Sequence, residues 1–359
     1  MPPKKIRIAV AGLGRIGWKC HCREIAQHSP FELAAVHDTD PGRRREAETV
    51  YGVTAYASYA EMLRSADLEA VVVATPTHTH KDLAIEALRA GCHVLLEKPM
   101  AVTGKEAAEI VRVAKVEGRL LTVFQSMRAV AYFQHLRRIV ASGFLGRVYH
   151  VSMGGYRYVR RDDWQSLSHY GGGVMLNAGS HFLDQLLQLI GYDVKQVFCY
   201  RSRVATLGDA EDVLKVVFET QTGVLGECEI NQASTITPFS LLVWGTTGAL
   251  EMSPAQDSFV VTRLRKSDLP PKKLNASLAS RNRRYPFDDP WLWRKTILVD
   301  PDRTVDIYAN LASAIRRGTP LFVKPEEPLA VMRLIDQCVR ASGEIHDLES
   351  QARAGANRT

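Results

Sequence analysis

The chain has 359 residues, of which 46% are hydrophobic and 24% are charged, and its formal net charge is +7. This composition is typical of a soluble globular protein and excludes a disordered or fibrous chain. At roughly 100–200 residues per domain, the length predicts two domains, and the chain contains no run of about 18 apolar residues that would predict a membrane span.

The first 125 residues alternate short apolar runs with segments of helical spacing. The predicted strands cover residues 6–11, 32–37, 71–74, 93–96 and 120–124. The predicted helices cover residues 15–27, 41–50, 81–90 and 105–116. Continuous apolar strands between helices indicate a parallel sheet that is covered on both faces. Right-handed crossovers then make residues 1–125 an α/β domain with a doubly wound Rossmann sheet.

Residues 126–347 show a different pattern, which predicts an α+β domain with an open, mostly antiparallel sheet. Its predicted strands cover residues 148–157, 195–204, 212–218, 224–231, 239–244 and 258–264. Its predicted helices cover residues 132–141, 174–190, 305–317 and 328–342. We expect this domain to bind substrate and to carry an oligomer interface. We expect residues 348–359 to form a tail, with residues 355–359 frayed.

Residues 265–294 fit neither a helix nor a strand pattern. One interpretation is a solvated surface loop. The other is a loop at the substrate site or a subunit interface, because the segment contains Trp291 and Trp293 and tryptophan is enriched in interfaces.

The motif Gly12-Leu-Gly14-Arg-Ile-Gly17 directly follows the first predicted strand and opens the first predicted helix. In that context a GxGxxG pattern predicts a dinucleotide site. Gly12 permits the tight turn, Gly14 lets the backbone approach the pyrophosphate, and Gly17 allows close packing of helix on strand. The amides of Arg15 and Ile16, at the helix N-terminus, are expected to receive the phosphates.

Asp38 lies 21 positions after Gly17, at the end of the second predicted strand. An acid at this place accepts hydrogen bonds from the adenosine ribose hydroxyls and repels a 2′-phosphate, which favours NAD over NADP. Arg43 and Arg44 follow closely and can bind a phosphate instead. The sequence therefore predicts NAD and leaves NADP as the second choice.

The six cysteines include no CxxC pair and no Cys/His cluster with zinc spacing. We therefore expect reduced thiols, no metal and a cytoplasmic location. The start of the chain has no apolar stretch long enough for a signal peptide. Because the basic residues are dispersed and form no nucleic-acid motif, we expect anionic small molecules, and neither nucleic acid nor membrane, as partners.

Three further segments complete a recognisable set: Ala74-Thr-Pro-Thr-His-Thr-His80, Glu97-Lys-Pro-Met100, and the run from Gly171 to Asp184 that reads GGGVMLNAGSHFLD. With the glycine motif, they resemble the Gfo/Idh/MocA family (glucose–fructose oxidoreductase, inositol dehydrogenase and rhizopine catabolism) over about residues 5–347. The resemblance implies a Rossmann domain and a second open sheet whose face meets the cofactor. It also implies redox chemistry at a hydroxyl or carbonyl carbon of a sugar or cyclitol.

The resemblance assigns the family's lysine to Lys98 and its histidine to His181. His181 is suited to act as a base, since its reference pKa is near working pH, and Lys98 is suited to hold the reacting oxygen. Many family members carry an aspartate four residues before the histidine, where this chain has Asn177. That departure argues against inositol dehydrogenase itself. Asn177 is predicted to orient substrate or histidine, with helix capping as the alternative, and Asp184 is a candidate to hold the imidazole.

Other residues are placed near the cofactor or substrate by position and resemblance. For the cofactor they are Thr75, Pro76, His80, Glu97, Lys98 and Gln125. For the substrate they are Arg128, Tyr156, Trp164, Asn177 and His181. His80 is equally suited to cap the next helix, and Arg128 to form an ion pair between domains. Pro99 is a candidate for a cis peptide bond.

These features favour an NAD-dependent oxidoreductase that acts on a secondary hydroxyl of a sugar, nucleotide sugar or cyclitol-like substrate. Two alternatives stay open: a glycosidase that uses transient oxidation by bound NAD, and a non-catalytic NAD(P)-binding regulator. Predicted strands such as 224–231 carry apolar residues on both faces, so we expect a homodimer or homotetramer.

Overall fold

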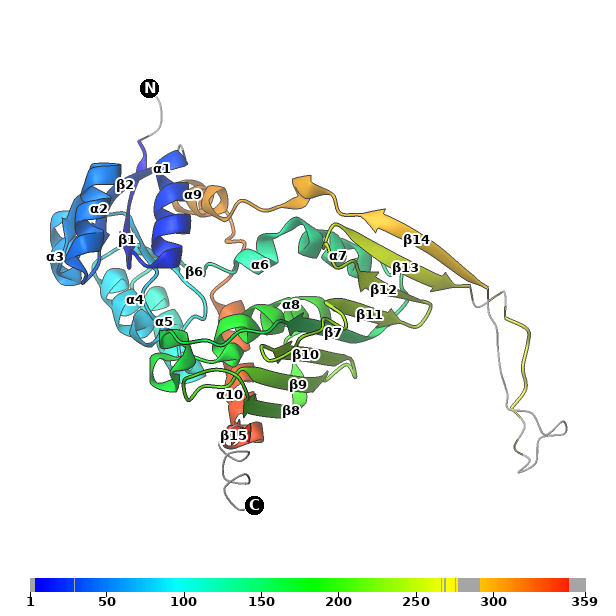
Figure 1. Cartoon of the computed structure of the whole chain (residues 1–359). Helices are drawn as coiled ribbons and strands as arrows, with labels where there is room; N and C mark the ends of the chain where they lie inside the picture. Colours follow the sequence, from blue (N-terminus) through cyan, green and yellow to red (C-terminus); the bar gives the residue numbers. More distant parts are fainter. Residues whose placement is uncertain are drawn as a thin grey trace, which may run out of the picture.

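A computed structural model describes residues 4–348 apart from 29, 266, 268, 275 and 277–290. The first sheet has six parallel strands in the order β3-β2-β1-β4-β5-β6, which is the predicted doubly wound arrangement (Figure 1). Its strands are β1 (Ile6–Ala11), β2 (Phe31–His37), β3 (Thr54–Tyr56), β4 (Ala70–Val73), β5 (His93–Leu96) and β6 (Leu121–Val123). The strand order reverses beside β1, so the ends of β1 and β4 open a crevice for a ligand.

Five helices cover this sheet: α1 (Arg23–Gln27), α2 (Pro41–Tyr51), α3 (Tyr59–Ser65), α4 (His80–Arg89) and α5 (Gly104–Val116). Asp40 caps α2 as predicted, because its carboxylate accepts from the amides of Gly42 and Arg43. The first helix covers the predicted residues 15–27, and its middle part is a π-helical segment η1 (Gly17–Cys22) that precedes α1. The sequence analysis missed β3 and α3, which are too short to give a clear period.

The second sheet has nine strands in the order β14-β13-β12-β11-β7-β10-β9-β8-β15. They are β7 (Val148–Tyr156), β8 (Val194–Arg203), β9 (Val213–Thr220), β10 (Leu225–Asn231), β11 (Leu241–Gly245), β12 (Gly248–Met252), β13 (Ser258–Leu264), β14 (Leu292–Leu298) and β15 (His346–Asp347). The sheet is mostly antiparallel, as predicted. It is mixed because β10 runs parallel to β7 and β15 runs parallel to β8.

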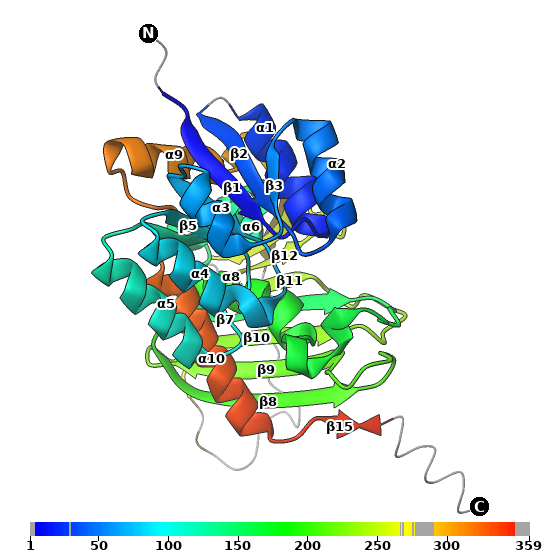
Figure 2. The ribbon, with the colours of Figure 1, turned by 90° about the vertical axis from the view of Figure 1, so that its left-hand side faces the viewer.

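The helices of this part are α6 (Ser126–Ala129), α7 (Ala131–Ala141), α8 (Ser180–Ile190) and α10 (Glu326–Ser342). Helices α8 and α10 lie on the same face of the sheet, toward the first domain (Figure 2). Helix α8 is preceded by a π-helical turn η5 (Met175–Gly179) within the predicted helix 174–190. The second sheet thus carries the Gly171–Asp184 motif on the side that faces the Rossmann domain.

The chain returns to the first domain near its end. Helix α9 (Ile307–Arg317) lies beside α1 (Figure 1). Its buried residues Ile307, Tyr308 and Leu311 join the same apolar cluster as Ile6 and Ile8 of β1. The Rossmann sheet is therefore covered in part by a helix that is distant in sequence.

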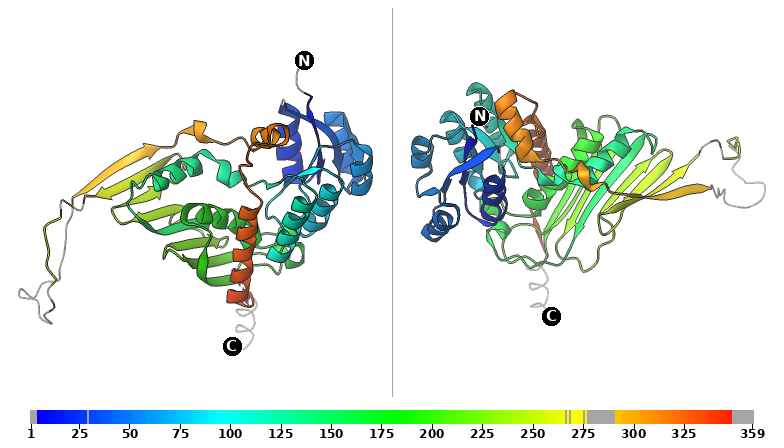
Figure 3. Two further views of the ribbon diagram at one scale, coloured as in Figure 1. Left: turned by 180° about the vertical axis from the view of Figure 1, so that it is seen from behind. Right: turned by 90° about the horizontal axis from the view of Figure 1, so that it is seen from above.

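The predicted irregular segment 265–294 was too long at its C-terminal end. Strand β14 begins at Leu292 and pairs with β13, so Trp293 lies in the sheet, and the β13–β14 pair projects from the molecule (Figure 3). Trp291 is exposed. Residues 277–290 and the predicted tail beyond Leu348 lie outside the described residues. Among the residues that are described, no helix is both long enough and apolar enough to span a bilayer.

Candidate functional site

A cleft of about 1120 Å³ lies between the two domains. Its walls include the glycine turn after β1, the ends of β2, β4 and β5, and residues around η3 (Trp164–Ser166) and η5. The predicted site residues that line it are Gly12, Gly14, Arg15, Ile16, Asp38, Thr75, Pro76, His80, Glu97, Lys98, Trp164, Asn177 and His181. A volume of this size at a domain interface is typical of a ligand site.

The glycine turn has the geometry that a dinucleotide pyrophosphate requires. Gly12 has φ +93°, and a Cβ there would lie 2.6 Å from the carbonyl oxygen of Ala74. A Cβ on Gly17 would lie 1.8 Å from the Gly12 carbonyl oxygen, so the turn and helix can pack only with glycine. A Cβ on Gly14 would meet nothing within 4 Å, so the backbone there is open for a ligand. These three positions fit a bound dinucleotide.

Asp38 is nearly buried at the end of β2, and its carboxylate is fixed by backbone amides. Oδ2 accepts from the Leu13 amide at 2.7 Å, and Oδ1 accepts from the Asp40 amide at 2.8 Å. Arg43 Nη1 is 3.5 Å from Oδ2, whereas Arg44 donates to the Asp38 carbonyl oxygen at 2.7 Å. The carboxylate is thus held at the cleft wall beside the glycine turn, which suits the adenosine ribose.

Lys98 and Asn177 come together across the domain boundary. The Lys98 ammonium donates to the Asn177 carbonyl oxygen at 3.0 Å and to Asn177 Oδ1 at 3.1 Å. Burial lowers the pKa of Lys98, and the nearby Glu97 carboxylate opposes that effect. The Glu97–Met100 and Gly171–Asp184 motifs therefore meet in the cleft, where the Lys98 ammonium contacts Asn177.

His181 lies on the first turn of α8 and lines the same cleft. Burial lowers its pKa well below 6.5, and the positive charge of Lys98 lowers it further. The imidazole is therefore neutral near pH 7 and free to accept a proton. Its Nδ1 is buried and has no hydrogen-bond partner among the described residues. Asp184, considered above as the group that holds the imidazole, forms an ion pair with Arg128 instead.

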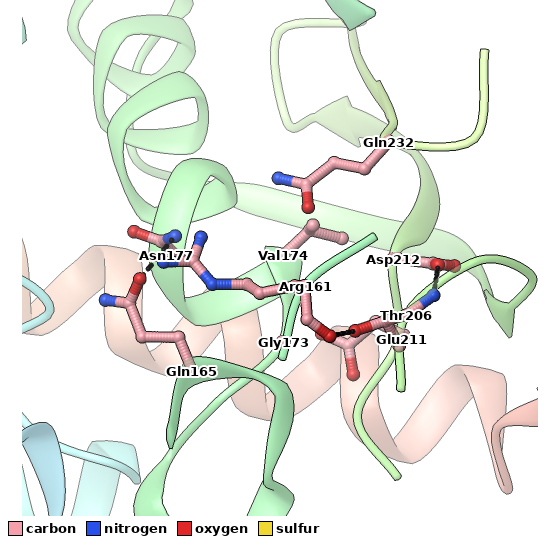
Figure 4. Close-up of a pocket in the computed structure, with 9 residues that line it drawn as sticks. All are labelled: Arg161, Gln165, Gly173, Val174, Asn177, Thr206, Glu211, Asp212 and Gln232. Atoms are coloured by element: carbon pink, nitrogen blue, oxygen red, sulfur yellow. Dashed lines mark hydrogen bonds between the residues drawn. The ribbon is translucent and has the colours of Figure 1, made fainter. Parts of the chain in front are cut away.

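A small chamber of about 10 Å³ lies behind Asn177 (Figure 4). The Asn177 side-chain amide donates to Gln165 Oε1 at 3.3 Å, and Arg161 lies beside them. Sequence reasoning missed Gln165 and Arg161, because they lie in an irregular segment that carries no motif. Gln165 fixes the side chain of Asn177, and its neighbour Asp163 also lines the main cleft.

The wall that follows β4 is braced by His80. The ring of His80 is buried, with Nδ1 2.8 Å from the Pro99 carbonyl oxygen and Nε2 2.9 Å from the Thr75 carbonyl oxygen. The Lys98–Pro99 peptide bond is cis, as the sequence analysis expected. His80 thus ties the Thr75-Pro76 loop to the Lys98 turn, and it also forms the first residue of α4.

Four predicted site residues are absent from the residues that line the cleft. Gly17 acts through packing, as described, and Gln125 is buried at the start of α6. Arg128 binds Asp184 (Nε to Oδ2, 2.9 Å) and Glu327, so its guanidinium is engaged in the ion pair that was the alternative reading. Tyr156 packs its ring against Phe239 with a centroid distance of 5.7 Å. Among the described residues, no group of three or more His, Cys, Asp or Glu side chains is placed to hold a metal.

Comparison with known families gives two matches that cover most of the described chain. The family model described as "Oxidoreductase family, NAD-binding Rossmann fold" matches residues 6–125. The "GFO/IDH/MocA C-terminal domain" model matches residues 133–251. The two matches meet close to the change of pattern near residue 126.

Among curated proteins, the D-glucoside 3-dehydrogenase of Escherichia coli K12 is 29% identical over 196 residues, 54% of this chain and 56% of that protein. The matched region spans somewhat more than half the length of the first curated relatives. Two solved structures align over nearly the whole chain. An NAD-binding protein from Listeria innocua has a TM-score of 0.82 at 26% identity, covering 95% of this chain and 98% of that one. The WlbA dehydrogenase from Bordetella pertussis, solved with NADH and UDP-GlcNAcA, has a TM-score of 0.76 at 25% identity, covering 94% and 97%.

Proposed function

Since the chain belongs to the GFO/IDH/MocA oxidoreductase family, we propose that it is an NAD-dependent dehydrogenase or reductase of a sugar-like substrate. In this proposal hydride passes between a secondary hydroxyl carbon and nicotinamide. The observation that carries it is the contact of Lys98 with Asn177, beside a neutral His181, in a cleft that also contains the glycine turn.

The side chains divide the chemistry of alcohol oxidation between them. NAD, when bound, accepts the hydride from the carbinol carbon. His181 takes the hydroxyl proton, because its depressed pKa keeps the imidazole unprotonated. The Lys98 ammonium holds the oxygen on which negative charge develops. In the reverse direction His181 returns the proton to that oxygen.

Asn177 is proposed to orient the substrate. It cannot exchange a proton, but it accepts from Lys98 and donates to Gln165. A substrate hydroxyl that enters this corner would join the same hydrogen-bond set. The proton transfer therefore rests on His181 and Lys98, and Asn177 fixes the geometry.

NAD is favoured over NADP by Asp38, whose carboxylate would repel a 2′-phosphate. Two observations support the sugar-like substrate. The relative from Escherichia coli is named as a glucoside dehydrogenase, and the Bordetella structure holds NADH together with a nucleotide sugar. The cleft volume of about 1120 Å³ is large enough for a cofactor and a further ligand.

The test begins with native mass spectrometry for retained cofactor, followed by a panel of sugars, nucleotide sugars and cyclitols read by NADH absorbance. We expect turnover with NAD on at least one substrate, and a loss of at least about 10²-fold in K98M. K81M is the control, since Lys81 lies on α4 and pairs with Asp82, away from Lys98.

Two results would contradict the dehydrogenase proposal. Glycoside cleavage without net reduction of free NAD would indicate the glycosidase alternative. An unchanged biological effect of K98M, with no turnover in the wild type, would indicate a regulator.

A further inference from the structure

A chain of three buried titratable side chains lies behind the Lys98 turn. His21 is in η1, Glu97 follows β5, and Tyr308 is on α9. His21 Nδ1 is 2.5 Å from the Tyr308 hydroxyl, and His21 Nε2 is 2.9 Å from Glu97 Oε1. The exposed fractions are 0% for His21, 4% for Tyr308 and 8% for Glu97. A carboxylate of the cleft is thus linked through an imidazole to a distant helix.

Donor and acceptor can be assigned in the hydrogen bonds that join these three side chains. The Glu97 carboxylate can only accept, so His21 Nε2 is the nitrogen that donates to Oε1. The other ring nitrogen, Nδ1, is then placed to accept from the Tyr308 hydroxyl. Glu97 Oε2 accepts from the Lys98 backbone amide at 2.9 Å. Both carboxylate oxygens are therefore fixed, one by His21 and one by the Lys98 turn.

The hydrogen bond from the Lys98 backbone amide places the Glu97 carboxylate at the turn that carries the Lys98 ammonium. Burial lowers the pKa of Lys98, Glu97 raises it, and Arg15 and Arg161 lower it. The titratable or charged groups around Glu97 are Cys20, His21, His80, Lys98 and Tyr308. Those around Lys98 are Arg15, Glu97, Arg161 and His181. In this set Glu97 is the group that favours the charged form of Lys98.

We propose that His21 and Tyr308 are positioning residues that hold the Glu97 carboxylate at the Lys98 turn. Neither side chain lines the cleft, so their effect passes through Glu97. The catalytic consequence rests on the dehydrogenase proposal above, whereas the hydrogen-bond chain itself does not.

A matched pair of variants separates this role from simple packing, because the His21 ring also packs against Phe124 at a centroid distance of 4.8 Å. In H21Q the side-chain amide nitrogen takes the place of Nε2 and can still donate to Glu97. In H21N the side chain is shorter, so its amide group lies where Nδ1 was, toward Tyr308, and does not reach Glu97. Both variants lose the ring and its contact with Phe124, and they differ in where the side-chain amide lies and by one methylene group. Y308F keeps the aromatic ring and removes only the donor.

The first measurement is the pH dependence of kcat/KM. Activity that needs the charged lysine is lost as pH rises through the Lys98 pKa. We expect H21N to move this alkaline limb down by about one pH unit, because Glu97 loses its anchor. H21Q should lie near wild type, and Y308F should move in the same direction by less. The control is H150Q, since His150 makes a comparable imidazole–carboxylate contact, with Glu227 at 3.2 Å, in the second sheet.

The second measurement uses the cofactor-free protein. Histidine ¹⁵N spectra should show the His21 proton on Nε2 in the wild type and a changed Nδ1 shift in Y308F. NADH fluorescence should show weaker binding in H21N than in H21Q, because Glu97 lines the cleft.

Equal pH profiles for H21N and H21Q, or a proton on Nδ1, would overturn the proposal. Should no substrate be turned over, the dehydrogenase proposal fails, while the spectra and NADH binding still decide the role of His21.

Discussion

Asp38 is the residue on which the proposed preference for NAD over NADP depends. Its two oxygens are occupied by the amides of Leu13 and Asp40, so the carboxylate cannot turn away from the cleft. Arg43 and Arg44 lie close by, but Arg44 donates to backbone carbonyls rather than into the cleft. The backbone therefore holds the Asp38 carboxylate in place. The guanidinium groups of Arg43 and Arg44 already have partners within the protein.

Replacing Asp38 by alanine should weaken NADH binding by about 10- to 100-fold, because a hydrogen bond to a charged group contributes about 1.5–3 kcal/mol. NADPH binding should improve relative to NADH, since the repulsion of the 2′-phosphate is removed and Arg43 is released. Fluorescence titration with both cofactors measures the ratio of dissociation constants. D40N is the control, because Asp40 caps α2 outside the cleft. A ratio that D38A leaves unchanged would show that Asp38 does not select the cofactor.

The lowered pKa of His181 gives a prediction about the protonation of its imidazole. Its pKa lies well below 6.5 through burial and the Lys98 charge, so the imidazole gains its proton only when the pH falls far below that value. K98M removes the repelling charge and should move the His181 pKa upward, toward 6.5. A histidine NMR titration of wild type, K98M and K81M measures this. A wild-type His181 that titrates at 6.5 or above would contradict both the burial argument and its role as a neutral base.

At the scale of secondary structure, one buried arginine joins three helices. Arg128 of α6 binds Asp184 of α8 and Glu327 of α10. Arg128 and Asp184 are each about 1% exposed, and burial raises the pKa of Asp184 while Arg128 opposes that shift. The ion pair therefore holds α8, which carries His181, against helices from other parts of the chain.

R128M should lower the free energy of unfolding by about 3–5 kcal/mol, because it leaves a buried carboxylate without its partner. Denaturant unfolding measures the loss. The double variant R128M/D184L should recover part of it, since the unpaired charge is then gone as well. A change of less than about 1 kcal/mol in R128M would mean that this pair does not support α8.

At the scale of the whole molecule, the second sheet has one face that the described helices leave open (Figure 1). Phe198 and Val217 stand opposite one another on neighbouring strands of that face, next to the ion pair of Glu227 with Lys215. Phe198 is 61% exposed. Apolar side chains on an open sheet face are typical of a surface that is covered by another subunit.

We propose that the chain forms a homodimer or homotetramer through this face. Mass photometry at micromolar concentration should give two or four times the chain mass of 40.0 kDa. F198E should shift the distribution toward the monomer, because a charge would then be buried in the interface. L274E is a comparison on the exposed segment after β13 and should have no effect. A wild-type monomer would remove the proposal.

The sequence by itself determined the parallel, doubly wound character of the first domain and the place of its glycine turn, and it named Asp38, Lys98 and His181 as candidate site residues. These features depend on local patterns: apolar runs, glycines where a Cβ has no room, and motifs of fixed spacing. It also indicated the α+β character of the second domain. It missed short elements such as β3 and α3, and it placed the start of β14 inside a loop, because these segments gain their structure from neighbours rather than from a period of their own.

Only the tertiary structure decided which side chains meet. Lys98 and Asn177 are 79 positions apart, and His21 and Tyr308 are 287 apart, so no local pattern could predict either contact. The same holds for Arg128, for which the sequence left a place near substrate and an ion pair open, and which the fold placed in a buried ion pair. Burial and charge pairing are properties of the packed chain, and they set the protonation of His181 and Lys98 on which the proposed chemistry depends.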